Sequence, residues 1–176
     1  IQLRDPGFVD EIAAALRETG LDPSRLTMEI TESTICDDID EAARILGRIR
    51  ALGLSISVDD FGTGYSSLSY IKNLPVDVVK IDREFIKDLD TNERARRIVE
   101  SVVQLAHEMD ITVIAEGVET TRQFELLRQI GCDCAQGFLF SHALPADELE
   151  YLFFGEANLE MQTAEAPRKK GKAKIE

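Results

Sequence analysis

Six polar side chains lie at or near the ends of five short apolar segments of this chain. They are Glu29, the adjacent Asp59 and Asp60 of the stretch SVDDFGTGYSSL, Lys80, Glu116 and Gln136. One charged residue in such a place is most often a solvated edge. Five consecutive apolar segments that each supply a polar or charged group are hard to explain in that way. The set therefore predicts a functional site.

The chemistry that suits these residues is the binding of divalent cations. Clustered carboxylates repel one another unless cations neutralise them. Mg²⁺ and Mn²⁺ prefer oxygen ligands and suit a cluster of Asp and Glu that lacks His and Cys. Two such ions ~4 Å apart would suit phosphoester hydrolysis, with Asp59 bridging the ions and Asp60 reaching the second. We expect Lys80 to orient or help deprotonate the attacking water, or to neutralise a phosphate oxygen; a structural counter-ion is the alternative.

The segment after the two aspartates is rich in glycine. Gly62 and Gly64 permit backbone turns that other residues avoid, so this loop can fold back over the cations. Glu32 follows Glu29 by three residues, in the stretch ITES. It lies past the end of its apolar segment, and we expect it to anchor the glycine loop by hydrogen bonds.

The elements that must position these residues alternate between strand and helix. Strands are expected at Leu26–Thr31, Leu54–Asp59, Val76–Asp82, Ile111–Val118 and Cys132–Phe140, and helices at Phe8–Thr19, Ile39–Leu52, Asn92–Met109, Thr121–Ile130 and Pro145–Phe154. This alternation predicts an α/β fold with a parallel sheet covered by helices. Ligands of such sheets gather at the carboxyl ends of the strands, where the polar residues lie.

The longest expected helix has a recognisable start and an apolar stripe. Asn92 is expected to cap its amino end. Ile98, Val102, Leu105 and Met109 lie on one face at helical spacing and are expected to face the core.

Composition narrows the class of protein. The formal net charge of −13 argues against DNA and anionic lipid as partners, because both attract basic surfaces. No apolar run approaches the ~18 residues that span a bilayer, so we expect no membrane segment in this piece. Cys36, Cys132 and Cys134 form no convincing metal or disulfide framework, and His107 and His142 are expected to be structural.

The end of the chain differs from the rest. From Glu156 onward the alternation stops, and residues 156–176 end in the basic stretch APRKKGKAKIE. A disordered basic tail is expected there, with a lysine-rich contact to an acidic partner as the alternative. Residues 1–155 are expected to form the folded part.

Five motifs, in this order and spacing, resemble those of the EAL-domain phosphodiesterases: MEITES, DDFGTGYSSL, VVKIDREFI, VIAEGVET and QGFLFS. The resemblance extends from Ile1 to about Phe154. It implies a (β/α)₈ TIM-like barrel of the EAL type. It also implies the hydrolysis of the bacterial messenger cyclic di-GMP to linear pGpG at a site with two Mg²⁺ or Mn²⁺ ions.

The resemblance assigns the four carboxylates to the metals. Glu29 and Asp59 match metal ligands, with Asp59 bridging. Asp60 and Glu116 match the ligands of the second metal.

It also assigns five other residues. Lys80 and Gln136 match residues that position the nucleophilic water, so that Lys80, Glu116 and Gln136 are the catalytic candidates. Glu32 matches the acid that holds the loop. Asp82 and Glu119 resemble positions near the guanine or the rim of the site.

The chain also departs from the family pattern. The Glu of the family's Glu-Ala-Leu stretch and a metal-binding Asn do not occur in it. About five of the eight strands of a barrel are recognisable. We therefore expect the C-terminal two-thirds of an EAL domain, truncated at its amino end and inactive alone. The alternative is a degenerate module that binds cyclic di-GMP, or a protein partner, without cleavage. All family positions that the chain covers are intact, which favours truncation.

The resemblance further implies partners and a location. It implies a homodimer formed through helices near the DDFGTGYSS loop, and an upstream sensor or GGDEF domain in the parent protein. It places the module in the bacterial cytoplasm, within a parent protein that a membrane segment elsewhere could anchor.

Overall fold

The computed structural model describes residues 3, 5–36, 38–62, 71–152 and 154. The chain divides into two compact units, residues 1–140 and 141–176. In the second unit residues 146–152 are helical, as expected for Pro145–Phe154. The predicted tail, residues 156–176, lies outside the described residues. Within the described part, no helix is both long and apolar enough to span a membrane.

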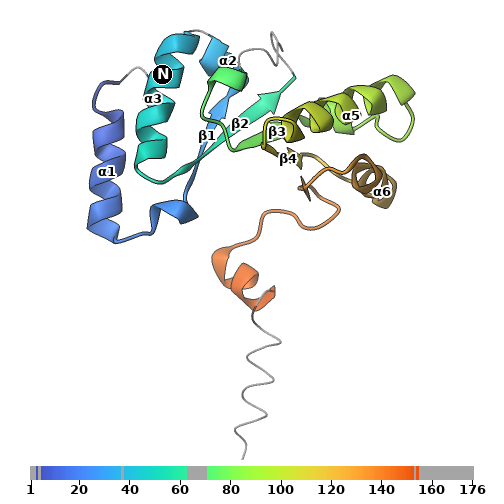
Figure 1. Cartoon of the computed structure of the whole chain (residues 1–176). Helices are drawn as coiled ribbons and strands as arrows, with labels where there is room; N and C mark the ends of the chain where they lie inside the picture. Colours follow the sequence, from blue (N-terminus) through green and yellow to red (C-terminus); the bar gives the residue numbers. More distant parts are fainter. Residues whose placement is uncertain (1–2, 4, 37, 63–70, 153, 155–176) are drawn as a thin grey trace, which may run out of the picture. The chain divides into compact units, whose positions relative to one another are not determined.

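The first unit is built around one parallel sheet with the strand order β1-β2-β3-β4-β5 (Figure 1). The strands are β1 (Thr27–Thr31), β2 (Ser55–Phe61), β3 (Val78–Ile81), β4 (Thr112–Ala115) and β5 (Cys134–Ala135). The helices are α1 (Phe8–Thr19), α2 (Glu32–Cys36), α3 (Ile39–Ala51), α4 (Arg83–Ile86), α5 (Glu93–His107) and α6 (Thr121–Ile130), with short 3₁₀ turns η2 (Pro23–Arg25) and η3 (Ile71–Asn73). The predicted α/β architecture with parallel strands is confirmed.

The two faces of the sheet differ in chemistry because side chains alternate along each strand. One face is apolar and buried, and the register aligns its residues across β1 to β4: Ile30, Val58, Val79 and Val113. The helices cover this face, with α3 packing on β2 and α5 on β4. The opposite face carries Glu29, Asp59 and Lys80. The candidate residues are therefore separated from the main core by the sheet itself.

A β-bulge in β2 keeps both aspartates off the apolar face. Val58 pairs with Val79 and Phe61 pairs with Ile81, so β2 uses one residue more than β3 over this stretch. Asp60 takes the positive φ of 55° that the extra residue requires. Strict alternation from Val58 would place Asp60 on the apolar face and Phe61 on the polar face. The bulge instead buries Val58 and Phe61 and leaves the aspartates on the polar side or at the strand end.

The apolar stripe predicted for α5 is confirmed only in part, because Val102 and Met109 pack against the core and Ile98 and Leu105 do not. Ile98 and Leu105 are 40% and 36% exposed, whereas Val99, Val103 and Ala106 are buried. The buried set has helical spacing too, and α5 packs on β4. The expected cap is confirmed, because the side chain of Asn92 accepts hydrogen bonds from the first turn of the helix.

The bounds of all five strands differ from the prediction by at least one residue, and β4 ends at Ala115 rather than at Val118. β2 continues to Phe61 rather than ending at Asp59, because the bulge restores its pairing with β3. β5 contains only two residues of the predicted Cys132–Phe140. Beyond Ala135 the backbone turns, and the amide of Phe140 donates to the carbonyl of Gly137 instead of to a strand.

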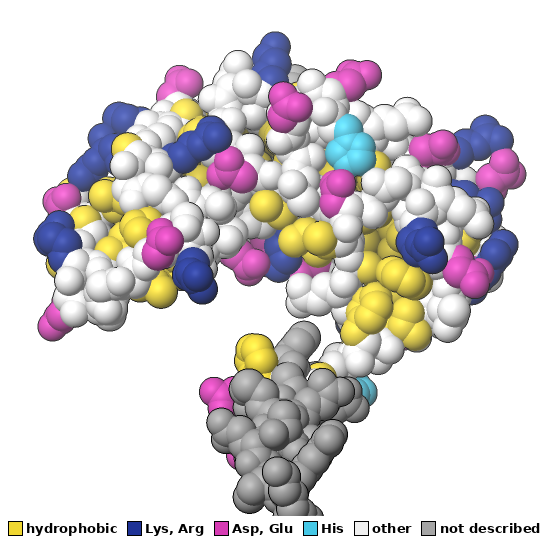
Figure 2. Space-filling model, turned by 60° about the horizontal axis from the view of Figure 1, so that its bottom comes forward, with side chains coloured by type: hydrophobic (Ala, Val, Ile, Leu, Met, Phe, Trp, Pro, Cys, Tyr) yellow, Lys and Arg dark blue, Asp and Glu magenta, His cyan; other side chains and the backbone are white. Residues whose placement is uncertain are grey.

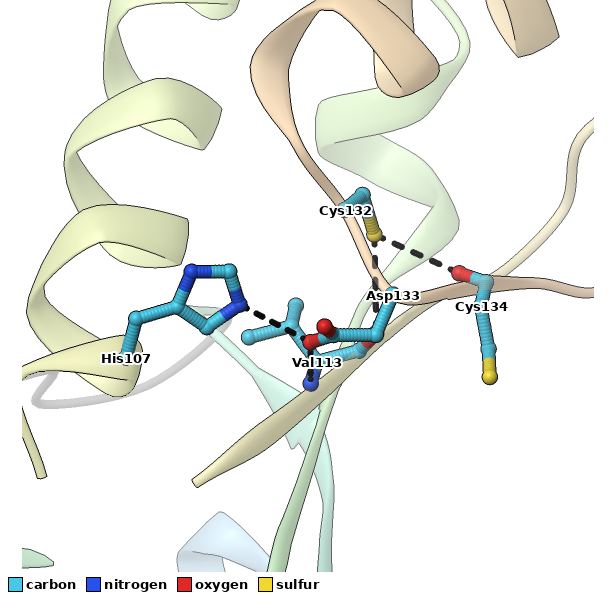
Figure 3. Close-up of polar contacts among 5 residues, drawn as sticks. All are labelled: His107, Val113, Cys132, Asp133 and Cys134. Atoms are coloured by element: carbon cyan, nitrogen blue, oxygen red, sulfur yellow. Dashed lines mark hydrogen bonds and ion pairs between the residues drawn. The ribbon is translucent and has the colours of Figure 1, made fainter. Parts of the chain in front are cut away.

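Asp133 ties β4 to the carboxyl end of α5 (Figure 3). Its Oδ2 accepts from the amide of Val113 at 2.8 Å and lies 2.9 Å from Nε2 of His107. Burial opposes ionisation of Asp133, but these two partners outweigh it and lower the pKa of the carboxyl. Beside it the Cys132 thiol donates to the carbonyls of Val113 and Cys134, and burial raises its pKa to about 11. These contacts agree with structural roles for His107 and Cys132.

Asp133→Asn should destabilise the protein at neutral pH by about 1 kcal/mol, because the charge-assisted contacts of the carboxylate are weakened. The folded pKa lies below the ordinary value of 3.8, so the contribution is present above that pH and is lost as the pH falls through the lowered pKa. Urea unfolding of both proteins from pH 5 to pH 3 should show the difference shrinking with acidification. Glu108→Gln, an exposed change at the end of the same helix, is the control. A difference that grows at low pH would contradict this account.

Candidate active site

Three carboxylates converge on one ammonium at the polar face of the sheet. Nζ of Lys80 lies 3.1 Å from Oε1 of Glu29, 3.5 Å from Oδ1 of Asp59 and 2.7 Å from Oε1 of Glu116. Lys80 comes from β3, its partners from β1, β2 and the residue after β4. Four of the six residues singled out from the sequence thus form one cluster, which we call the Lys80 cluster.

The cluster fixes the charge state of Lys80. Its side chain is only 8% exposed, and burial alone would lower its pKa. Hydrogen bonds to Glu116 and Glu29 and the charge of Asp59 outweigh burial and raise the pKa above the ordinary 10.5. An ammonium has no lone pair with which to accept a proton. This arrangement therefore favours the expected roles of orienting water or neutralising a phosphate over the role of a base.

Asp60 lies beside the cluster on the strained residue of the bulge. Its amide donates to Oδ1 of Asp59 at 2.9 Å. Burial raises the pKa of its carboxyl, and the negative charges of Asp59 and Asp82 raise it further, while Lys80 acts against them. Asp60 thus experiences the concentration of negative charge that was expected to require cations.

A cavity of about 320 Å³ adjoins the cluster. Its walls include all the remaining candidates except Glu32, together with Glu116 of the cluster: Asp60, Asp82, Arg83, Glu116, Gly117, Glu119, Gln136, Gly137 and Phe138. Asp82 also caps α4, since its Oδ1 accepts from the amide of Glu84 at 2.7 Å. The structure therefore groups Asp82, Glu119 and Gln136 around one space.

Arg83 and Phe138 line this cavity and were missed from the sequence. Each stands one or two residues after a candidate, in the stretches KIDR and QGF, and that adjacency was the signal available. Phe138 is 61% exposed, so an aromatic surface faces solvent at the cavity wall.

The cavity wall at Gln136 and Gly137 packs closely against the backbone of Ala115 and Val118. The amide of Gln136 donates to the carbonyl of Ala115 at 2.8 Å, and its carbonyl accepts from the amide of Val118 at 3.0 Å. A Cβ on Gly137 would lie 2.2 Å from the carbonyl oxygen of Val118. Only glycine fits there, so Gly137 holds Gln136 against the segment that carries Glu116.

Glu32 has the contact that a loop anchor needs. It is the first residue of α2, is 1% exposed, and its Oε2 accepts from the amide of Gly62 at 2.9 Å. This bond fixes the start of the glycine-rich segment. Residues 63–70, which hold most of that segment, lie outside the described residues.

The donors at the cluster have the right chemistry for a hard divalent cation. Carboxylate oxygens of Glu29, Asp59 and Glu116 already surround one positive charge, the Lys80 ammonium, which stands in for a cation. Over the described part of the chain, no group of three or more His, Cys, Asp or Glu is itself arranged to hold a metal ion. The donor set fits Mg²⁺ or Mn²⁺, while its present arrangement is that of an ion-paired cluster.

Acidic and basic side chains occur together on one face of the molecule, as Figure 2 shows. Several of them are paired, among them Arg44 with Glu41 and Arg97 with Glu93.

Comparison with known proteins gives consistent matches. The family model described as EAL domain matches residues 1–143. Cyclic di-GMP phosphodiesterase NbdA of Pseudomonas aeruginosa is 44% identical over 143 residues, 81% of this chain and 18% of the relative. The structure of the MucR phosphodiesterase in complex with cyclic di-GMP, from the same organism, has a TM-score of 0.80 at 44% identity and covers 84% of this chain and 60% of that one.

A further solved structure contains a metal. It is Klebsiella pneumoniae BlrP1 with manganese and cyclic di-GMP, with a TM-score of 0.75 at 35% identity over 80% of this chain and 36% of that one. The same protein was also solved with calcium and cyclic di-GMP. The chain spans about a fifth of the length of the curated relatives it matches.

Gly137→Ala should lower the free energy of unfolding by about 3 kcal/mol, because its methyl group would overlap backbone atoms that cannot retreat. Gly47→Ala is the matched control. Gly47 lies inside α3 with open space around it, so the same change should stabilise by about 0.5–1 kcal/mol. Denaturant unfolding measures both. Equal stability of Gly137→Ala and wild type would show that the close approach is not rigid.

Proposed function

The chain belongs to the EAL domain family, and on that premise we propose that residues 1–155 form the C-terminal two-thirds of an EAL domain that hydrolyses cyclic di-GMP to linear pGpG with divalent cations. The observation that carries this proposal is the convergence of Glu29, Asp59 and Glu116 on Lys80 at the polar face of the sheet. Relatives named as cyclic di-GMP phosphodiesterases and neighbours solved with cyclic di-GMP support the substrate.

We assign Glu29 and Asp59 to one Mg²⁺ or Mn²⁺ ion, and Asp59, Asp60 and Glu116 to a second. The manganese and calcium complexes of the neighbour support the choice of a divalent cation. Bound there, such ions would supply positive charge that activates water and stabilises the leaving oxygen. Asp60 and Glu116 also line the cavity, so ions bound to these carboxylates would lie beside it.

The other residues bind and orient the substrate. Lys80 is a buried ammonium beside the cavity and can donate hydrogen bonds to the attacking water or to a phosphate oxygen. Gln136 offers an amide at the wall of the cavity, which Asp82 and Glu119 also line. We assign Asp82 and Glu119 to positions near the guanine or at the rim of the site. In the reaction the water oxygen bonds to phosphorus, the bond to the 3′ ribose oxygen breaks, and that oxygen takes the proton, which opens the ring to pGpG.

The second candidate function is a cyclic di-GMP receptor that does not cleave its ligand. One observation favours it. The carboxylates of Glu29, Asp59 and Glu116 are engaged by Lys80. A receptor would bind the dinucleotide without metal and would not depend on Asp59.

We propose the partners and the location that the family resemblance implies. They are a homodimer through helices beside residues 59–67, an upstream sensor or GGDEF domain, and the cytoplasm. An apolar cavity lined by Phe61, Phe85 and Val102, at which Ile98 is 40% exposed, supports an interface beside α5. The name of MucR, a bifunctional diguanylate cyclase and cyclic di-GMP phosphodiesterase, supports the presence of a cyclase domain.

Asp59→Asn in the full-length protein should reduce cyclic di-GMP turnover at least ~100-fold with either Mg²⁺ or Mn²⁺, because it removes a charge shared by both cation sites. Chelation with EDTA should abolish turnover of the wild type. Chromatographic detection of pGpG is the measurement. Asp90→Asn, the same change at an exposed turn, is the control and should keep wild-type rates. Metal-independent binding without any pGpG would instead establish the receptor function.

Residues 1–176 alone should be inactive. In the part of the chain that the structure describes, β1 and β5 are the edges of an open sheet, whereas a TIM-like barrel closes with eight strands. The family's Glu and Asn ligands are also not supplied by this sequence. The same pGpG assay, run on residues 1–176 and on the full-length protein, tests this. Comparable turnover by both would contradict our account of the missing ligands.

A further inference from the structure

We propose that Lys80 is an internal counter-cation that holds the carboxylates of Glu29, Asp59 and Glu116 together in the metal-free protein and competes with divalent cations for them. This inference rests on the proposed metal site. It assigns Lys80 a role before any substrate binds, in addition to its expected contact with water or phosphate.

The first support is enclosure. The side chain of Lys80 is 8% exposed, so its ammonium has little access to water and depends on protein partners for solvation. The three ion-pair partners that Lys80 has among the described residues are carboxylates expected to hold cations. A divalent cation that binds these carboxylates therefore shares them with a buried positive charge.

The second support is that the partners are placed by rigid elements. The parallel register fixes the backbone of Glu29 opposite Ser57 on β1 and β2, and that of Lys80 opposite Ile114 on β3 and β4. Oδ1 of Asp59 is held in addition by the amide of Asp60. Like charges so positioned repel unless a cation lies between them, and Lys80 supplies that cation from within the fold.

The three pairs differ in how easily they can be broken. Glu116 makes the shortest contact, 2.7 Å, and its side chain is 21% exposed. Glu29 lies at 3.1 Å and is 53% exposed, so water can solvate it when it leaves the ammonium. We expect Glu29 to turn toward an incoming cation first and Glu116 to stay with Lys80 longest.

Competition has a measurable consequence for metal affinity. Two positive charges a few ångströms apart repel strongly in a partly buried site. Removing the ammonium should therefore tighten Mn²⁺ binding, by about tenfold or more, even in a protein that has lost turnover. The effect is opposite in direction to that of removing a residue that helps to bind the metal.

The experiment is calorimetric titration of MnCl₂ into the metal-free full-length protein, comparing wild type, Lys80→Met and Lys87→Met. Lys87 is an exposed lysine paired with Glu84 on α4, so its replacement changes the net charge equally but leaves the cluster intact. We expect a Kd about tenfold or more lower for Lys80→Met and a Kd within about twofold of wild type for Lys87→Met. Lys80→Arg, which keeps the charge, should not tighten binding.

Thermal unfolding gives a second readout that needs no activity. Without metal, Lys80→Met should melt below wild type, because the carboxylates have lost their cation. With saturating Mn²⁺ its gain in Tm should exceed that of wild type. Lys80→Gln serves for both measurements if Lys80→Met does not fold.

The outcomes separate this inference from the proposed function. Equal or weaker Mn²⁺ binding by the uncharged variants Lys80→Met and Lys80→Gln, with clear binding by wild type, would overturn the competition and leave the metal site standing. Lack of Mn²⁺ binding by every variant would overturn the metal site itself and this inference with it.

Discussion

The polar face of this sheet depends on one balance of charge. Three carboxylates brought together by a parallel sheet would repel one another, and the buried ammonium of Lys80 is what offsets that repulsion. The burial that makes the lysine costly to charge is outweighed by the acids that surround it. The ammonium and the three carboxylates therefore stabilise one another. They place a positive charge next to a cavity that is lined by further polar groups.

Backbone features of the surrounding loops maintain this balance. The bulge at Asp60 lets β2 bury Val58 and Phe61 while both aspartates avoid the helix-covered face. Glu32 then fixes the amide of Gly62, the first residue after the strand. The bulge and the positive φ of Asp60 cost conformational free energy that a regular strand would not require. They are consistent with a strand end shaped for ligand binding rather than for sheet stability alone.

Much of the fold could be predicted from the sequence, because local signals were strong. α1 and α6 were expected with the bounds they have, since Gly20 and Gly131 end them in the left-handed conformation. Long-range effects could not be predicted. Period-two alternation does not reveal a bulge, and apolar spacing could not tell Val99 from Ile98 as the buried residue of α5. The convergence of acids at the strand ends followed from the parallel order of the strands. Lys80 as a counter-ion was the alternative stated from its sequence position, and which three carboxylates it contacts required the structure.

The most direct measurement is the anomalous scattering of manganese in crystals of the full-length protein soaked with Mn²⁺. The account predicts peaks within coordination distance of the carboxylates of Glu29, Asp59 and Glu116, with Nζ of Lys80 displaced from at least one of them relative to the metal-free crystal. Peaks only elsewhere on the molecule, with Lys80 still bound to all three carboxylates, would contradict it.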